Sequence, residues 1–280
     1  MVKIKIVTDS TSDLTNEEID RHQIEVVPLT ISVAGEIYRD RIDITPTEFM
    51  KKMLESIELP KTSQPSAGSF LEVYDRLGEE GYEVISIHLS GKMSGTVQAA
   101  ESAAAMTKTK VTVVDSLFIS KALSFQVLEA AKMVNEGHQV ESVVGKLKNV
   151  CQNSRLFIVV DTLENLSKGG RIGKGKAMLG SLLNIKPIAS LENGEYTPVA
   201  KVRSHAQAAK YIAKVFAEDV KDKAIKCVGL VHADGNDLAL MIQQAIKEKT
   251  GYELDRIEET TPVISTHTGP GAVGFMYYAE

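Results

Sequence analysis

The sequence predicts an α/β protein with two domains. Apolar strand patterns alternate with helical patterns through the first half of the chain, which is typical of a mainly parallel sheet with helices on both faces. The second half mixes strands, a hairpin signal and helices, which favours a mixed sheet. A length of 280 residues suits two domains. The change of rhythm near 149–154 predicts an N-terminal domain at 1–152 and a C-terminal domain at 153–280.

The first half contains four expected strands with helices between them. Residues 3–8 alternate charged and apolar side chains, which is a strand pattern. Thr15 and Glu18 form a capping-box pattern, which begins a helix at Asn16 because both side chains accept from free backbone N–H groups. The remaining apolar runs predict strands at 24–33, 84–89 and 111–114, and helices at about 46–56, 96–106 and 120–136.

The second half opens with an expected strand at 156–161 and a glycine-rich loop. Asn193-Gly194 is a turn signal, so we expect a hairpin over 187–200. A loop containing His267 is expected to lead into a last apolar stretch. The other patterns predict helices at 177–183, 206–218 and 238–250, and strands at 227–232 and 256–262.

The composition indicates a folded, cytoplasmic protein. Hydrophobic residues make up 43% of the chain and charged residues 25%, which excludes disorder as the expectation. The net charge of -5 gives no global reason to bind nucleic acid or an anionic membrane. The first strand lacks the apolar run of a signal peptide, and no window approaches the ~20 apolar residues of a membrane span, so we expect no stable membrane insertion. Cys151 and Cys227 match no metal spacing, so no metal is expected.

Ser94 lies in the turn between an expected strand and the helix at 96–106. In open α/β sheets, ligands bind beyond the carboxyl ends of the strands, and the following helix offers free N–H groups to an anion. A hydroxyl at this position can act as a nucleophile or as an anchor for a ligand. The residues alone leave both roles open.

The segment 170–177 nearly matches the phosphate-binding loop of nucleotide-binding proteins. Ala177 replaces the hydroxyl residue that would hold Mg²⁺, and a helical pattern at 162–168 stands where a strand is required. We therefore reject a nucleotide site. A basic, glycine-rich loop at 168–176 remains, which can meet a phosphate or a partner or simply be solvated.

A serine hydrolase is the second functional hypothesis. The segment 91–95 approaches the nucleophile elbow of α/β hydrolases, but Ser94 stands one place late. His267 is the histidine with a suggestive loop, and no Asp or Glu stands near it in sequence to complete a triad. A regulatory or interaction protein without a ligand is the third hypothesis. The segment 60–66 reads as an extended, hydroxyl-rich loop.

Six short motifs, in order along nearly the whole chain, resemble those of the DegV family. They are Thr8-Asp9-Ser10-Thr11-Ser12-Asp13-Leu14, Lys61-Thr62-Ser63-Gln64-Pro65, Ser90-Gly91-Lys92-Met93-Ser94-Gly95-Thr96, Val114-Asp115-Ser116, Asp161-Thr162-Leu163-Glu164-Asn165-Leu166 with Gly169-Gly170-Arg171-Ile172, and His267-Thr268-Gly269-Pro270-Gly271. The resemblance implies a two-domain α/β protein that encloses one long-chain fatty acid, such as palmitate, stearate or oleate, between its domains. Members of this kind in Gram-positive bacteria are similar to the FakB-like subunit of a fatty-acid kinase.

The resemblance also implies roles for single residues. Thr62, Ser94 and His267 fall on positions that hydrogen-bond the fatty-acid carboxylate, and Ser63 and Gly95 are adjacent. Arg171 and Arg203 match arginines associated with a dihydroxyacetone-kinase-like partner subunit or with the acyl phosphate. The implied protein is a carrier that holds no cofactor, catalyses nothing alone and supplies phospholipid synthesis. The aliphatic segment 178–185 is a candidate lining of the acyl tunnel.

Overall fold

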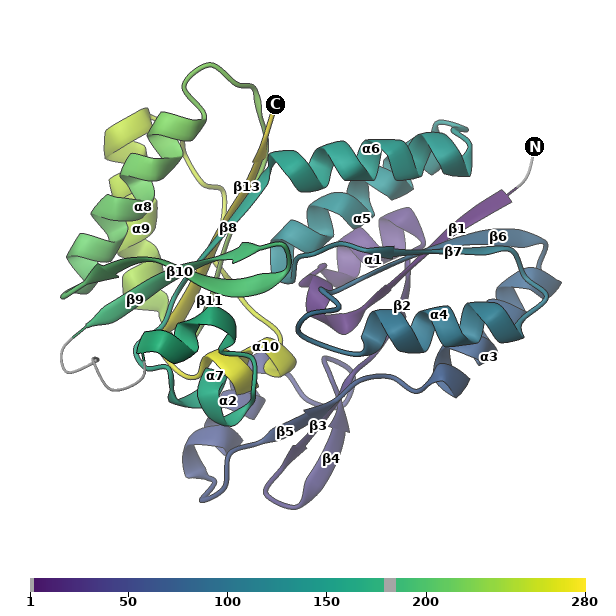
Figure 1. The fold of residues 1–280 in the computed structure, drawn as a ribbon, viewed down its shortest axis with the longest axis horizontal. Coiled ribbons are helices and arrows are strands. Elements are labelled where there is room, and N and C mark those ends of the chain that lie inside the picture. The colour runs from purple at the N-terminus through teal and green to yellow at the C-terminus, as the bar shows by residue number, and fades with distance from the viewer. Residues whose placement is uncertain (1–2, 179–184) are drawn as a thin grey trace.

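The computed structural model describes residues 3–178 and 185–280, and it has two α/β domains (Figure 1). The sheet of the first domain has four parallel strands in the order β2-β1-β6-β7. These strands are β1 (Lys3–Asp9), β2 (Glu25–Val27), β6 (Tyr82–His88) and β7 (Val111–Asp115). The expected parallel sheet is therefore confirmed, and the Ser94 turn lies past the carboxyl end of β6.

Helices cover both faces of this sheet, as the run of buried residues at the end of β1 requires. Val7 packs under α3 (Ala67–Glu79) and α4 (Thr96–Met106) on one face. Ile6 belongs to the core beneath α5 (Ser120–Asn135) on the other. The 3-10 turn η1 (Ser10–Ser12) and α1 (Asn16–His22) follow β1, and the predicted capping box of Thr15 and Glu18 is formed.

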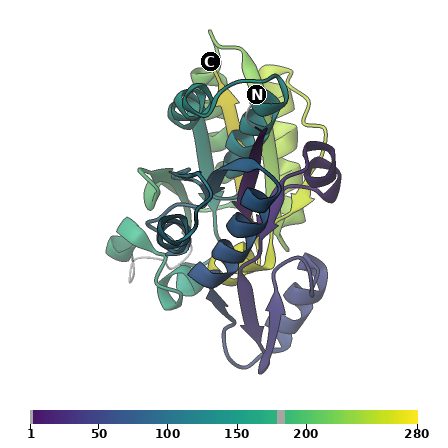
Figure 2. The ribbon, with the colours of Figure 1, turned by 90° about the vertical axis from the view of Figure 1, so that its right-hand side faces the viewer.

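The single strand expected over 24–33 is wrong, because Pro28 divides it into strands of two sheets. β2 stays in the parallel sheet, whereas β3 (Thr30–Val33) lies between β4 (Glu36–Arg39) and β5 (Lys61–Ser63) in a small antiparallel sheet. Proline has no N–H to donate to a ladder, so it stands where the chain changes sheets. The segment expected as an extended loop supplies β5, and α2 (Pro46–Glu55) adjoins this small sheet (Figure 2).

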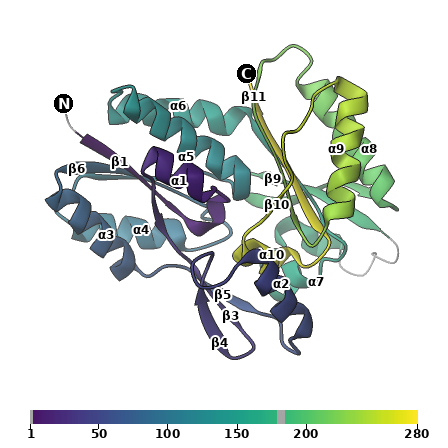
Figure 3. The ribbon, with the colours of Figure 1, turned by 180° about the vertical axis from the view of Figure 1, so that it is seen from behind.

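The sheet of the second domain is mixed, as predicted. Its order is β10-β9-β8-β13-β11-β12, with only the β11–β12 pair parallel. Asn193 and Gly194 both have positive φ angles and turn the predicted hairpin. Two long helices, α8 and α9, cover one face of the sheet (Figure 3). The elements are β8 (Ser154–Val159), β9 (Lys186–Glu192), β10 (Glu195–Val202), α8 (His205–Asp219), β11 (Ile225–Ala233), α9 (Asn236–Thr250), β12 (Glu258–Glu259) and β13 (Ala272–Ala279).

Several further elements differ from expectation or were not foreseen. The strand expected at 256–262 shrinks to β12, and α10 (Pro262–Thr268) begins where the strand was expected to end. α6 (Val140–Asn153) fills the region assigned to a boundary. α7 (Glu164–Lys168) agrees with the helical pattern at 162–168 and precedes the basic loop. The 3-10 turn η2 (Gly173–Met178) forms within that loop, and most of the helix expected at 177–183 lies outside the described residues.

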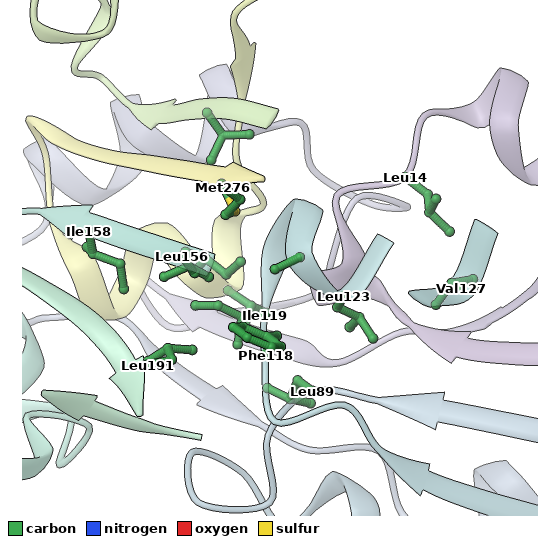
Figure 4. Packing of buried hydrophobic residues seen from close by; sticks show 14 of the residues in the cluster. Leu14, Leu89, Phe118, Ile119, Leu123, Val127, Leu156, Ile158, Leu191 and Met276 are labelled. Atoms are coloured by element: carbon green, nitrogen blue, oxygen red, sulfur yellow. The ribbon is translucent and has the colours of Figure 1, made fainter. Parts of the chain in front are cut away.

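One apolar core joins the two domains. Leu14 and Leu123 of the first half belong to the same cluster as Leu156, Ile158 and Met276 of the second (Figure 4). α5 contacts strands of both large sheets. The division at residues 152 and 153 falls at the end of α6 and stays a prediction, because packing is continuous across it.

Candidate functional site

A cavity of about 310 Å³ lies where the two domains meet, in the size range typical of ligand pockets. The small sheet, the turn after β6, the start of α5 and helices α7 and α10 all contribute to its wall. The lining residues are Thr11, Leu29, Thr62, Ser63, Gln64, Leu89, Met93, Ser94, Ile119, Ile158, Leu166, Arg171, Tyr196, Val263, Ile264, His267 and Thr268.

Apolar side chains of the shared core make up about half of the residues that line this cavity. Leu29, Leu89 and Ile119 come from the first domain, and Ile158 and Ile264 come from the second. All five side chains are buried. Such a wall offers dispersion contacts and no hydrogen bonds, so it suits a hydrocarbon chain and not a sugar or a nucleotide.

The polar part of the wall is assembled from segments far apart in sequence. Thr62 on β5 and His267 on α10 are joined by a hydrogen bond of 2.8 Å between Oγ1 and Nε2, across 205 positions. β5 is held in place by its ladder with β3. The structure therefore brings together two of the three residues implied as carboxylate ligands, and Ser94 lines the same cavity.

The loop expected around His267 is wrong, because His267 lies in the last turn of α10. Its Nδ1 is buried and has no hydrogen-bond partner among the described residues. Burial, together with the neighbouring Arg171, lowers the pKa of His267 to about 4, so the ring is neutral at pH 7. A Cβ at Gly169 would stand 2.4 Å from this Nδ1, so only glycine leaves the ring its place. A neutral imidazole can donate a hydrogen bond to a carboxylate without forming an ion pair with it.

Ser94 is positioned by its own turn and by α4. Its Oγ accepts from the backbone N–H of Thr96 at 3.3 Å and lies 2.9 Å from Thr96 Oγ1. The Ser94 backbone donates to the Ser90 carbonyl, and the Ser90 hydroxyl donates to the Gly194 carbonyl at the hairpin of the second domain. The turn that presents Ser94 is therefore tied to both domains.

Arg171 binds backbone carbonyls on both sides of the cavity mouth. Its Nε donates to Met93 O at 3.0 Å and its Nη1 donates to Gly169 O at 2.6 Å. The side chain lines the cavity, and its positive charge contributes to the lowered pKa of His267. A fixed guanidinium here places positive charge beside the Thr62–His267 pair, which favours an anionic head group.

The other predicted site residues lie at different distances from the cavity. Ser63 lines it. Gly95 contributes no lining atom, but a Cβ there would stand 2.2 Å from the side chain of Gln64, which does line it. Arg203 is exposed and does not line the cavity. Its backbone N–H donates to the side-chain oxygen of Gln207. In the segment expected to line the tunnel, Met178 is buried elsewhere in the core, and residues 179–184 lie outside the described part of the chain.

An outer groove of about 630 Å³ adjoins the polar end of the cavity. Thr62, Arg171 and His267 line both spaces, so this trio separates the interior from the groove. Lys61 and Lys168 add two cations to the groove. A head group held at the trio would therefore be reachable from outside while its tail stays enclosed.

Some lining residues were not foreseen, and their signals in the sequence differ. Thr11 follows the strand-end Asp9 and donates to its carboxylate, so a cap pattern at the end of a strand was the available signal. Tyr196 lies on β10 with a buried hydroxyl that has no hydrogen-bond partner, and burial raises its pKa well above the usual range. Nothing local marks Tyr196 as a cavity residue.

A chain of Ser, His and Asp hydrogen bonds does occur, but not at Ser94. Ser86 Oγ lies 2.7 Å from His88 Nε2, and His88 Nδ1 lies 3.0 Å from Asp9 Oδ2. All three side chains are fully buried, and Tyr74 donates to Ser86 from the other side. This network holds the carboxyl ends of β1 and β6 together. Ser94 and His267 are instead bonded to Thr96 and Thr62, which is not the arrangement of a nucleophile and its base.

Among residues 3–178 and 185–280, no group of three or more His, Cys, Asp or Glu side chains is arranged to hold a metal ion. No helix in that part of the chain is long and apolar enough to cross a bilayer.

The fold and the site define a two-domain α/β protein with a cavity at the domain junction, where apolar core side chains meet the polar side chains of Thr62, Arg171 and His267. The sequence pattern of the DegV family, described as uncharacterised proteins, matches residues 3–280. This chain therefore belongs to the DegV family. It is 46% identical to a DegV domain-containing protein of Listeria monocytogenes over 281 residues, covering 100% of both chains. It is 41% identical to one of Staphylococcus aureus, covering 99% of both.

Solved structures of the family have the same fold. A DegV family protein from Thermus thermophilus, described by its fatty acid binding, superposes with a TM-score of 0.93 at 38% identity, covering 99% of this chain and 100% of that one. DegV of Bacillus subtilis, described as a fatty acid binding protein, gives a TM-score of 0.90 at 32% identity, covering 100% of both. A stearic acid-binding protein from Eubacterium ventriosum gives 0.87 at 25% identity and 98% of both.

Proposed function

We propose that this protein binds one long-chain fatty acid in the cavity between its domains. The observation that carries the proposal is a single cavity that combines buried aliphatic side chains with the polar side chains of Thr62, Ser94 and His267. Fatty acids have this division of chemistry. The fatty-acid-binding relatives with the same fold support the assignment.

The tail supplies the affinity in this proposal. Burying about fourteen methylenes at ~0.8 kcal/mol each contributes on the order of 11 kcal/mol, against an association cost of several kcal/mol. The head group then fixes the orientation. Ser94 donates a hydroxyl hydrogen bond to the carboxylate. Thr62 and the neutral His267 share one of their two protons in their own bond and donate the other, and Arg171 supplies positive charge beside them.

We infer further that the protein is a carrier that presents the carboxylate to an ATP-dependent kinase subunit in the cytoplasm. The outer groove supports this role, because it meets the polar end of the cavity at the trio and carries Lys61 and Lys168. The partner subunit would form the acyl phosphate there, and the product would enter phospholipid synthesis. The failed match to a phosphate-binding loop fits a chain that leaves ATP to its partner.

The hydrolase hypothesis makes a different prediction for the same residues. Ser94 would have to lose its bond to Thr96, and His267 its bond to Thr62, before the two could act as nucleophile and base. Purified protein with acyl esters should therefore show no turnover. Ester hydrolysis that is lost in both Ser94→Ala and His267→Ala would replace the carrier proposal with the hydrolase.

Native mass spectrometry of the purified protein is the direct test. We expect the mass of one fatty acid per chain, and release by denaturation then identifies the acyl chain. Protein that is delipidated and reloaded with palmitate or oleate should regain that mass. Empty protein that also fails to take up either acid would refute the proposal and favour a regulatory protein without lipid.

Two serines on neighbouring segments separate anchoring from stability. Ser94→Ala removes a head-group donor, so the fatty acid should bind about tenfold or more weakly, as expected for ~1.5–3 kcal/mol. Ser102→Ala is the matched control, because Ser102 is exposed on α4 and donates only to the Gln98 carbonyl of its own helix. Equal affinity of the two variants would show that Ser94 does not bind the head group.

A further inference from the structure

Two carboxylates of the first domain are buried beneath the start of α10, the helix that carries His267. Asp13 accepts from the Thr261 N–H at 2.9 Å and from the Thr260 hydroxyl at 2.8 Å. Asp40 accepts from the Thr261 hydroxyl at 2.9 Å. Both acids are almost completely buried, at 4% and 1% exposure. The start of α10 is thus held to the first domain through these two acids.

The two acids are not equally well satisfied. Asp13 also accepts from the Ser120 hydroxyl, and Arg41 and Lys121 lie close enough to favour its charge. Lys121 is itself paired with Glu258 at 2.8 Å. The Ser10 hydroxyl and the Val263 N–H favour the ionised form of Asp40. Among residues 3–178 and 185–280, no cation favours it, and the Asp40 Oδ1 has no hydrogen-bond partner. The like charge of Asp13 disfavours ionisation of Asp40.

α10 is also a wall of the cavity. Val263, Ile264, His267 and Thr268 all line it. A motion that separated the start of α10 from the first domain would withdraw Val263 and Ile264 from the cavity wall, and the same motion would expose Asp40 to water.

We propose that Asp40 is a proton-controlled latch on the cavity, which holds α10 closed when protonated and favours opening when ionised. This inference rests on the proposed fatty-acid function. The physical reason is the cost of a buried charge with one unpaired oxygen beside a second carboxylate. Protonation removes that cost only while the site is closed, so protons favour the closed state by linkage.

The size of the effect follows from the two environments of Asp40. Burial, opposed by bonds from Ser10 and Thr261 and aided by the nearby Asp13 charge, raises the pKa of Asp40 from 3.8 to about 7 in the closed protein. If the hydrated carboxyl returns to its ordinary value, the opening equilibrium rises about tenfold between about pH 6 and pH 8. Asp13, whose pKa burial also raises, stays compensated by Arg41 and Lys121.

The test is the release rate of the fluorescent fatty acid cis-parinaric acid, measured from pH 6 to pH 8. Wild type should release the acid about tenfold faster at pH 8 than at pH 6. In Asp40→Asn the ratio of these two release rates should be about tenfold smaller. Asp43→Asn is the matched control, because Asp43 is a nearby surface acid bound to Arg39 and should behave as wild type. The same dependence in Asp40→Asn and wild type would overturn the proposal, and would assign the pH effect to the ligand's own carboxyl.

A second measurement needs neither a variant nor a lipid. NMR of protein labelled with carboxyl-¹³C aspartate reports the titration of Asp40 directly, and amide exchange of α10, corrected for intrinsic rates, reports opening. Titration near neutral pH with loss of α10 protection above it supports the latch even if no fatty acid binds. Constant protection across this range refutes the latch even if fatty acid does bind.

Discussion

His88 is fully buried in the first domain and His267 lines the cavity, and their ring nitrogens differ in hydrogen bonding. Both nitrogens of His88 are bonded, one to Ser86 and one to Asp9. His267 has a bonded Nε2 and an unpartnered Nδ1. A buried side chain whose polar atoms all have hydrogen-bond partners has a structural role. A side chain beside a cavity with one polar atom still unpartnered can bind a ligand. Hydrogen-bond completeness, and not residue type, separates the two.

The largest effect that would sharpen this comparison is on stability. His88→Ala leaves Asp9 buried without its ring partner and Ser86 without an acceptor, so unfolding should become easier by about 3–5 kcal/mol. His267→Ala removes a ring with a free nitrogen and should cost clearly less. Urea unfolding of the two variants measures both. An equal loss of stability would show that His267 is also a structural residue.

The next effect concerns ligand binding at the cavity that His267 lines. Thr62→Val with Ser94→Ala removes two head-group donors while keeping nearly the same volume, so affinity for palmitate should fall at least a hundredfold at ~1.5–3 kcal/mol per bond. Unfolding should shift little, because neither hydroxyl is fully buried. Isothermal titration with delipidated protein measures the affinity. Undiminished affinity would mean that the head group lies elsewhere in the cavity.

The fold was predictable to the extent that its signals are local. The turn of Ser94 follows from a strand, a glycine-rich turn and a helix that are neighbours in sequence, and the Asn193-Gly194 hairpin follows from two residues. α10 was missed, although Thr261 caps it and Pro262 stands at its first position. Its threonines and the glycine after Thr268 read equally well as a strand and a loop.

The site was predictable only in part, because its contacts are distant in sequence. No spacing rule places Thr62 beside His267 across 205 positions, and only the family resemblance pointed to both. Ile119 and Tyr196 enter the cavity because the domains share one core, which a pattern within one segment does not show. Arg203, also taken from the resemblance, lies outside the cavity, and a partner-facing role for it stays a proposal.

A smaller and more selective effect is expected at Gly169. The added Cβ of Gly169→Ala would stand 2.4 Å from His267 Nδ1, so the ring must move and the Thr62 bond must lengthen. Fatty-acid affinity should fall several-fold, with a loss of about 1 kcal/mol in stability from the displaced ring. Gly145→Ala is the control, because Gly145 is exposed on α6 with open space around its Cα, and alanine there should stabilise by roughly 0.5–1 kcal/mol. Unchanged affinity in Gly169→Ala would show that the position of His267 does not matter for fatty-acid binding.

The smallest expected effect is a near-cancellation in the pH dependence of stability. His267 has a folded-state pKa of about 4, below its ordinary value, so the unfolded chain binds the extra proton and stability rises with pH from about 4 to 6.5. Asp40 has a folded-state pKa of about 7, above its ordinary value, so the folded protein binds the extra proton and stability falls with pH from about 4 to 7. The two contributions oppose each other over nearly the same range.

Single variants should therefore reveal slopes that wild type conceals. Each group contributes up to about 1.4 kcal/mol per pH unit, so Asp40→Asn should make the unfolding free energy rise more steeply with pH, and His267→Gln should make it fall. Urea unfolding from pH 4.5 to 6.5 measures these slopes. The double variant should return close to the wild-type slope, because both proton sites are then absent. A double variant that keeps the slope of either single variant would show that one histidine or one aspartate, and not their opposition, sets the pH response.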